Sequence, residues 1–463
     1  MRVIFIFSFL FLLVPKSSQS QRNLATMNEA WNKFMSAPGI SNAQSGISIV
    51  SSKTGIAVFD KNSKQNLMPA SSLKTLTGLL ALENFDTRHT FQTHLGYSGT
   101  INADRVLEGN IVVECQGDPA FMSSRTDHYK GLLDGWAQSI KSMNISGIQG
   151  ALIIDESYFE GFSIASGVLF DDPGNYYAGG SSACSFIDNT QVLKLRSYGI
   201  GTKVECLSQH PELYINYNVQ AIASQSNKDE AFVIGVPGSY DRFIIGSIPA
   251  NRDSFEIEAS LPEPSHALAS EFQRAFVKAG INVDMMTFVF NKNPATKPTY
   301  TVIQSKTSIP LLAIVQQMEK ESINLYADVL LRHCAKKNSI STDLTSAAGL
   351  LEKRTKDKYA SLYDGAGLSR KNLISPLSMC NAILSFDSQI QSQIQDCLKS
   401  DINETRKVYY KTGYMEGIRA RSGFLFRNGE KYVFSFMVNN YNGNSLELRK
   451  VMDELIDGIS AGL

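Results

Sequence analysis

Residues 69–74 read Pro-Ala-Ser-Ser-Leu-Lys, and they open a stretch in which leucines recur at spacings of three and four as far as Phe85. This periodicity predicts a helix that begins directly after Pro69. Ser71 and Lys74 form the only S-x-x-K pair of the chain, one turn apart on one helical face. Free N–H groups at a helix start favour negative charge on the serine oxygen, and a lysine in a water-poor cleft loses its proton easily. The pair therefore predicts a nucleophilic serine with a lysine as its proton acceptor.

A second motif, Ser322-Ile323-Asn324, lies within the stretch from Ile309 to Lys337, whose apolar pattern predicts one long helix. A serine and an asparagine two residues apart serve a helix interior poorly, because both compete for backbone hydrogen bonds. This favours a functional interpretation, in which Ser322 relays a proton and Asn324 binds an amide. Ser142-Met143-Asn144 repeats the pattern, so S-x-N alone is a weak indication.

The third motif, Lys411-Thr412-Gly413, ends a predicted strand that begins at Val408. A strand edge that offers a lysine, a hydroxyl and an uncrowded glycine can hold an extended peptide and its carboxylate. Lys53-Thr54-Gly55 is a second copy, between the apolar, β-branched runs 46–50 and 56–59. We interpret that copy as the turn of a hairpin, with its glycine where a positive φ is useful.

The order S-x-x-K, S-x-N, K-T-G is typical of β-lactamases and penicillin-binding proteins. The chain resembles the class C low-molecular-mass penicillin-binding proteins, the D-Ala-D-Ala carboxypeptidase/endopeptidase family. The 251 residues from Ser71 to Ser322 are similar to that family, whose catalytic domain carries a large insertion, whereas β-lactamases have a far shorter gap. Other matching segments are Pro69-Ala70-Ser71, Gly117-Asp118-Pro119, Asn175-Tyr176-Tyr177 and residues 364–370, Asp-Gly-Ala-Gly-Leu-Ser-Arg.

The resemblance implies catalytic roles for three side chains. Ser71 would be the acylated nucleophile and Lys74 its proton acceptor. Ser322 would pass the proton to the leaving amine. Asn324 would orient the amide of the substrate.

The resemblance also implies a binding site on the K-T-G strand. Lys411 would bind the terminal carboxylate, Thr412 would donate a hydrogen bond to it, and Gly413 would leave room for the peptide. The backbone N–H groups of Ser71 and Tyr414 would form the oxyanion hole.

Four further positions qualify this expectation. Arg370 could reach a side-chain carboxylate of the peptide, and Asp155, after a buried strand, could reach its amino group. A solvated arginine and a turn-capping aspartate are the alternatives. Ile323 and Ala366 depart from the family pattern, which usually has a polar residue and a serine there, although neither replaces a reacting group.

The chain changes character between about His89 and Pro262, where short alternating runs separated by Gly, Pro and Asn predict mostly strands and one helix at 129–143. The expected strands of this part are 91–95, 110–114, 151–154, 191–195, 212–217, 231–236 and 254–259. Outside it we expect helices at 27–38, 265–280, 309–337, 346–358, 376–385 and 445–459, and strands at 46–50, 56–59, 408–412, 423–427 and 431–439.

We therefore predict an α/β (α+β) fold with a discontinuous catalytic domain, residues 21–88 and 263–463. The resemblance implies that this domain is like the transpeptidase domain of penicillin-binding proteins and serine β-lactamases. Residues 89–262 would form an inserted β-rich part.

The first twenty residues are typical of a signal peptide. Arg2 precedes an apolar run from Val3 to Val14, shorter than the roughly 20 residues that span a bilayer. Ser18 and Ser20 supply small side chains before a cut at Gln21. We expect an exported, periplasmic protein without a stable membrane span; an uncleaved anchor helix is the alternative.

Composition excludes several classes of protein. Lys plus Arg and Asp plus Glu both total 44 in 463 residues, so a nucleic-acid partner held by a basic excess is not expected. Hydrophobic residues make up 43%, which excludes wholesale disorder. The six histidines form no i, i+4 pair, and G-x-S-x-G, H-E-x-x-H and phosphate-loop patterns are absent, so neither a metal nor a cofactor is expected. The six cysteines could pair in any of 15 ways or remain buried thiols.

These observations predict an exported serine-type D-Ala-D-Ala carboxypeptidase/endopeptidase that acts on peptidoglycan stem peptides through a Ser71 acyl-enzyme. β-Lactams would acylate the same serine as covalent inhibitors. Two alternatives remain: a β-lactamase or esterase that uses the same three motifs, and a catalytically idle wall-binding protein in which the insert does the work.

Overall fold

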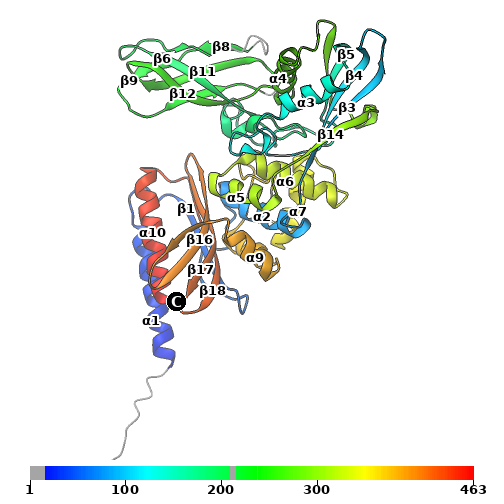
Figure 1. Ribbon diagram of the computed structural model, residues 1–463. Helices are drawn as coiled ribbons and strands as arrows, with labels where there is room; N and C mark the ends of the chain where they lie inside the picture. The colour runs from blue at the N-terminus through cyan, green and yellow to red at the C-terminus, as the bar shows by residue number, and fades with distance from the viewer. Residues whose placement is uncertain (1–15, 209–214, 237) are drawn as a thin grey trace, which may run out of the picture.

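The computed structural model describes residues 16–208, 215–236 and 238–463 (Figure 1). Strands from both ends of the described chain form a six-stranded antiparallel sheet with the order β15-β16-β17-β18-β1-β2. The strands are β1 (Gln44–Ser51), β2 (Ala57–Lys61), β15 (Lys399–Ile402), β16 (Arg406–Met415), β17 (Ile418–Arg427) and β18 (Glu430–Asn439). Strand β1 pairs with β18, so the two ends of the chain share one sheet.

Both predicted hairpins of this sheet are confirmed. Gly55, in the second K-T-G copy, has φ +68° and its N–H donates to Ser51 O, as a turn requires. Asn428 and Gly429 have φ of 52° and 79° between β17 and β18, the two left-handed residues that a tight hairpin turn needs.

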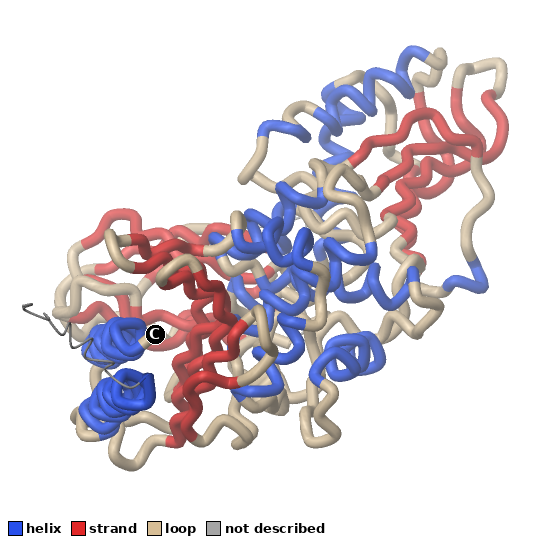
Figure 2. Tube along the Cα trace, turned by 90° about the horizontal axis from the view of Figure 1, so that it is seen from below, coloured by secondary structure: helices blue, strands red, loops and turns tan. Residues whose placement is uncertain are grey.

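Helices α1 (Lys16–Met35) and α10 (Ser445–Gly462) lie side by side on one face of this sheet (Figure 2). Trp31 and Phe34 of α1 pack on Phe436 of β18, and the ring centroids of Phe34 and Phe436 are 5.0 Å apart. The helix predicted from Met27 is therefore present but begins earlier, at Lys16. The predicted apolar run 3–14 lies outside the described residues.

The other face of the sheet carries a helical layer that separates it from the insert (Figure 1). Its members are the 3₁₀ turn η1 (Ala70–Leu73), α2 (Lys74–Asn84), α5 (Leu311–Glu321), α6 (Asn324–Lys337), α7 (Leu344–Thr355), α8 (Pro376–Leu384) and the unpredicted α9 (Ser388–Gln395). Helix α2 lies at the centre of this layer, and every residue from Lys74 to Leu82 is buried. A helix surrounded in this way holds its polar residues in fixed surroundings.

The prediction of one helix from Ile309 to Lys337 is wrong. Helix α5 ends at Glu321, Ser322 adopts a left-handed φ of 63°, Ile323 is extended, and α6 begins at Asn324. The second motif therefore forms a break between two helices. The Asn324 side chain bonds to Lys74 and to Tyr177 O, both outside α5 and α6, so the break leaves it free to make long-range contacts.

The inserted part contains a five-stranded mixed sheet with the order β13-β5-β4-β3-β14. Its strands are β3 (Gln92–Ile101), β4 (Val106–Cys115), β5 (Gly147–Asp155), β13 (Met286–Asn291) and β14 (Thr301–Thr307). Helices α3 (Leu132–Ser142) and α4 (Pro264–Lys278) pack on it, with the rings of Trp136 and Phe272 5.9 Å apart. Because α4, β13 and β14 complete this unit, we propose that the insert extends from about residue 89 to Thr307, beyond the boundary predicted at residue 262.

In its described residues, a second unit of the insert consists of strands around a small apolar core. Its strands are β6 (Thr190–Ser197), β7 (Glu205–Cys206), β8 (Asn216–Val219), β9 (Ile222–Ser224), β10 (Glu230–Ile234), β11 (Asp241–Pro249) and β12 (Arg252–Ser260). Strands β7, β9 and β11 were not expected from the sequence. Part of the run predicted at 212–217 lies outside the described residues.

All six cysteines are free, and all but Cys206 are buried. The thiols of Cys115 and Cys184 contact each other, which raises the pKa of Cys184 further than burial alone does. No helix in the described part of the chain is both long and apolar enough to cross a bilayer.

The packing of α1 on the sheet gives the first prediction. Phe34→Ala should lower the free energy of unfolding by about 3–4 kcal/mol, because a ring that is 2% exposed would leave a cavity. The matched control is Leu24→Ala on the same helix, 49% exposed, which should change it by less than about 0.5 kcal/mol. Urea unfolding followed by circular dichroism measures both, and equal effects would contradict the packing described here.

Candidate active site

Ser71 and Lys74 lie at the junction of η1 and α2, where the predicted helix starts as a 3₁₀ turn. Lys74 Nζ donates to Ser71 Oγ at 2.9 Å. Lys74 is 0% exposed, whereas Ser71 is only partly buried, so the serine faces the open side of the site and the lysine lies behind it. Ala70, directly before the serine, has a left-handed φ of 46°, a strained backbone of the kind found at functional sites.

The break between α5 and α6 brings Asn324 of the second motif to the same lysine. Asn324 Oδ1 accepts from Lys74 Nζ at 2.5 Å, and Asn324 Nδ2 donates to the carbonyl oxygen of Tyr177 at 2.8 Å. Ser322 is two residues away, on the left-handed turn. The asparagine thus has a fixed orientation between the catalytic layer and a loop of the insert.

The third contact of Lys74 is the carbonyl oxygen of Ala366, at 2.8 Å. The loop that carries it is held by two aspartates. Asp328 Oδ1 accepts from the backbone N–H groups of Gly365 and Ala366, and Asp364 accepts from those of Gly367 and Ser369. Two carboxylates therefore position the carbonyl that binds the lysine.

Glycines allow this loop and the K-T-G strand to approach η1 closely. A Cβ on Gly367, whose φ is 81°, would lie 2.0 Å from Ala70 O, and one on Gly413 would lie 2.5 Å from Pro69 O. Since these contacts are with backbone, a side chain at either position would push the loop or the strand away from Ser71.

Strand β16 presents the third motif at an open edge. Strand β15 pairs with β16 only as far as Tyr410, so within the described residues the edge from Lys411 to Met415 has no neighbouring strand. Lys411 is 2% exposed, and Tyr414 is 56% exposed. An extended peptide could add to the sheet along this edge, beside Ser71.

The two lysines have lowered pKa values. Burial, and then the nearby Lys411 ammonium, lower the pKa of Lys74 to about 7. Burial lowers the pKa of Lys411 as well, opposed by the carboxylate of Glu319. At neutral pH, therefore, a large fraction of Lys74 is uncharged and able to accept a proton.

Glu319 was not predicted as a site residue. It lies on α5 one turn before Ser322, is 1% exposed, and neither carboxylate oxygen has a hydrogen-bond partner among the described residues. Its Oε1 occupies the space beside Gly78 on α2, one turn after Lys74. Burial raises the pKa of Glu319, and the two lysines oppose that rise. Glu319 could have been predicted as a site residue from its position. It is a charged residue on the buried face of a helix, three residues before Ser322.

The two additional candidates lie in different places. Arg370 donates to the carbonyl oxygen of Glu416, just after β16, and so lies at the rim of the K-T-G strand. Asp155 is 2% exposed at the end of β5, where it accepts from Asn291 and from the N–H of Ser157. These described contacts of Asp155 are all within the insert, as expected for the turn-capping alternative.

A model of the D-Ala-D-Ala carboxypeptidase 3 (S13) family matches residues 27–459. The chain belongs to this family. It is 23% identical over 418 residues to D-alanyl-D-alanine carboxypeptidase DacB of Haemophilus influenzae, which covers 84% of each chain. It is 21% identical over 454 residues to the D-alanyl-D-alanine carboxypeptidase of an Actinomadura species, covering 92% of this chain and 83% of that one.

Among solved structures, the chain is similar to penicillin-binding protein 4 (dacB) from Haemophilus influenzae. The TM-score is 0.77 at 20% sequence identity, with 93% of this chain and 97% of that chain covered. This similarity confirms the predicted penicillin-binding-protein fold. Family membership confirms the predicted enzyme class, a serine-type D-Ala-D-Ala carboxypeptidase.

The charges around Lys74 give a prediction for pH dependence. The rate of acylation by a penicillin should rise as the pH passes about 7, where Lys74 loses its proton, and fall at alkaline pH earlier than an unperturbed lysine would require, as Lys411 becomes neutral. The Glu319 carboxylate favours the charged form of both lysines. Its removal in Glu319→Gln should lower both lysine pKa values, so both limbs of the profile should move to lower pH. Stopped-flow acylation rates across pH measure this.

The matched control is Glu321→Gln, two residues along the same helix, where the carboxylate is partly exposed and pairs with Arg125. Its profile should match that of the unmodified protein. A Glu319→Gln profile that is lower in amplitude but unmoved along the pH axis would mean that Glu319 affects packing and not the lysine charges.

Proposed function

We propose that this carboxypeptidase removes the terminal D-alanine of peptidoglycan stem peptides through an acyl-enzyme at Ser71. The observation that carries the proposal is the contact of a fully buried lysine with the hydroxyl of a partly exposed serine. Neutral Lys74 takes the hydroxyl proton while Ser71 Oγ bonds to the carbonyl carbon of the penultimate D-alanine. The oxyanion that forms is bound by the backbone N–H groups of Ser71 and Tyr414.

Collapse of this intermediate breaks the bond to the nitrogen of the terminal D-alanine. That nitrogen takes a proton through Ser322, and D-alanine leaves. Water then attacks the ester carbon and gives a proton to Lys74, and the shortened peptide leaves as Ser71 regains its hydrogen. The cycle consumes one water and needs no metal or cofactor.

Substrate binding in this proposal uses the open edge of β16. Lys411 attracts the terminal carboxylate, Thr412 donates to it, and Gly413 lets the peptide lie close to Ser71. Asn324 orients the scissile amide, supported by its contact with Tyr177. A peptide whose amine belongs to a second stem fits the same edge, so we include endopeptidase cleavage of D-Ala cross-bridges.

Export and β-lactam binding complete the proposal. The apolar run 3–14 and the small residues Ser18 and Ser20 support a signal peptide of residues 1–20, cut near Ser20, and a periplasmic location. β-Lactams would acylate Ser71 in place of the peptide. In support, one solved structure of the Haemophilus protein is a complex with a β-lactam.

The first test uses the nucleophile. Ser71→Ala should abolish both covalent labelling by a fluorescent penicillin and release of D-alanine from a stem pentapeptide, with a fall of at least about 10³-fold in rate. Intact-mass measurement and an assay for D-alanine report the two activities. Labelling that survives the change rejects the assignment.

The same measurements separate the alternatives. Rapid loss of the penicillin adduct from the unmodified protein would favour a β-lactamase. A Ser71→Ala protein that restores every cellular effect in a deletion strain would favour a wall-binding role for the insert.

The second test uses the two copies of K-T-G. Lys411→Met should lower kcat/KM for the pentapeptide on the order of 10- to 100-fold, the loss of one charged hydrogen bond. Lys53→Met, in the copy that forms a hairpin turn, is the matched control and should leave kcat/KM unchanged. A pentapeptide with a C-terminal amide should be a poor substrate of the unmodified protein. Its kcat/KM should fall little further in Lys411→Met, because it has no terminal carboxylate for that lysine to bind. Equal losses for the acid and the amide would contradict carboxylate binding by Lys411.

A further inference from the structure

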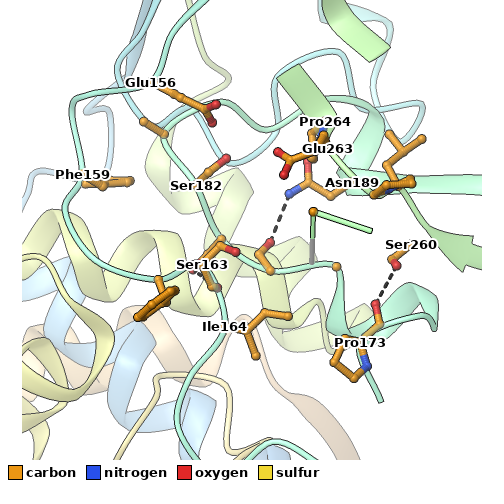
Figure 3. A pocket seen from close by; sticks show the side chains of 18 of the residues that line it. Glu156, Phe159, Ser163, Ile164, Pro173, Ser182, Asn189, Ser260, Glu263 and Pro264 are labelled. Carbon is orange, nitrogen blue, oxygen red and sulfur yellow. Dashed lines mark hydrogen bonds between the residues drawn. The ribbon is translucent and has the colours of Figure 1, made fainter. Parts of the chain in front are cut away.

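A cavity of about 450 Å³ lies where the two units of the insert meet helix α6 (Figure 3). Figure 3 shows Glu156 and Ser182 at one end, Pro173 and Ser260 at the other, and Ser163 and Ile164 along the wall between them. Its volume is in the range of small-molecule sites, which often lie between domains. None of the three motifs lines it.

Two buried guanidinium groups line this cavity. Asp328 and Asp343 act on the charge of Arg332 from a distance, and Asp241 acts on that of Arg242, but among the described residues no carboxylate lies within ion-pair distance of either. Arg242, 1% exposed, donates from one Nη only to the carbonyl oxygens of Ser239 and Asp241. Arg332, also 1% exposed, donates only to the carbonyl oxygens of Glu160 and Phe162. Within the described residues the Nε–H of each has no acceptor, and neither arginine forms an ion pair. Buried positive charge of this kind is costly, and a bound anion would offset the cost.

The cavity also contains negative charge. Glu156, 5% exposed, accepts from Ser265, and it shares Lys292 with Glu263 at 3.7 and 3.1 Å. Burial raises the pKa of Glu156, so a further cation beside it would be stabilising. The cavity thus offers donors for a carboxylate and acceptors for an ammonium group.

One wall of the cavity is continuous with the catalytic site. Residues 179–183 line the cavity, and Asn189 Nδ2 donates to Gly180 O at 3.1 Å, drawn in Figure 3. Two residues before this segment, Tyr177 O accepts from Asn324 of the catalytic layer. A molecule bound in the cavity would therefore contact the loop that orients Asn324.

We propose that this cavity is a second, non-catalytic binding site for short peptides that carry a free carboxylate and a free amino group. The carboxylate binds Arg242 and Arg332, and the ammonium group lies beside Glu156 and Glu263. This inference rests on the proposed function, because shortened stem peptides, the product of that reaction, belong to this chemical class.

The test is calorimetric titration of Ser71→Ala protein with the tetrapeptide L-Ala-γ-D-Glu-diamino acid-D-Ala. Two binding events are expected, one lost on adding Lys411→Met and the other weakened at least tenfold on adding Arg242→Gln. Arg252→Gln, an exposed arginine at the start of β12, is the matched control and should change neither event. Glu263→Gln, at a half-buried position paired with Lys292, gives a second route if Arg242→Gln does not fold, and should weaken the same event.

A tetrapeptide with its α-carboxylate converted to an amide should lose the event that depends on Arg242. The proposal is overturned if no event depends on Arg242 or Glu263, or if the amide or a neutral N-acetylglucosamine oligomer binds there as well as the peptide acid. If instead the proposed function is wrong, the titration of Ser71→Ala protein should show no binding event that depends on Lys411. The event that depends on Arg242 should still be present, so the two failures can be told apart.

Discussion

The structure depends on the amino group of one fully buried lysine. Lys74 Nζ contacts Ser71 Oγ, Asn324 Oδ1 and Ala366 O, which come from three segments separated by about 250 and 40 residues of chain. An ammonium group in such a place is expensive, since burial removes its water and Lys411 adds a second positive charge nearby. The three oxygens make burial tolerable, and the lowered pKa makes the lysine a base. The same burial therefore serves both packing and chemistry, and a segment that moved would change the basicity of Lys74 as well as its position.

Holding these segments together has a conformational cost that the surrounding core offsets. Ala70 and Ser322 adopt left-handed φ values of 46° and 63°, which side chains rarely occupy, and Gly367 adopts one of 81° against the backbone of Ala70. Ala70 and Ser322 each cost of order 1–3 kcal/mol, whereas the glycine adopts its conformation without this strain. The buried sides of α2 and the helices packed on it supply hydrophobic stabilisation on a far larger scale. The strained positions thus lie beside the reacting groups, where they fix the serine and the asparagine, and the apolar layer around them stays regular.

The sequence predicted the residues that meet at Lys74 but not the backbone that brings them together. Ser71, Lys74 and Asn324 belong to short patterns whose side-chain chemistry is informative without coordinates. The break at Ser322 was missed because the apolar spacing of α5 and α6 continues across it, and periodicity does not register one left-handed residue. Glu319 and Asp328 were missed because a lone carboxylate in a helical pattern is usually solvated. The extent that we propose for the insert rests on the pairing of β14 with β3, a long-range contact that local patterns do not contain.

The position of Asn324 also decides how the insert relates to catalysis. Its amide has two contacts, Lys74 Nζ on one side and Tyr177 O of the insert on the other. Without the insert, Nδ2 would lose its acceptor and the side chain could rotate away from the lysine, since an amide is oriented only by its partners. The insert therefore supplies one of the two contacts that orient Asn324 beside Lys74.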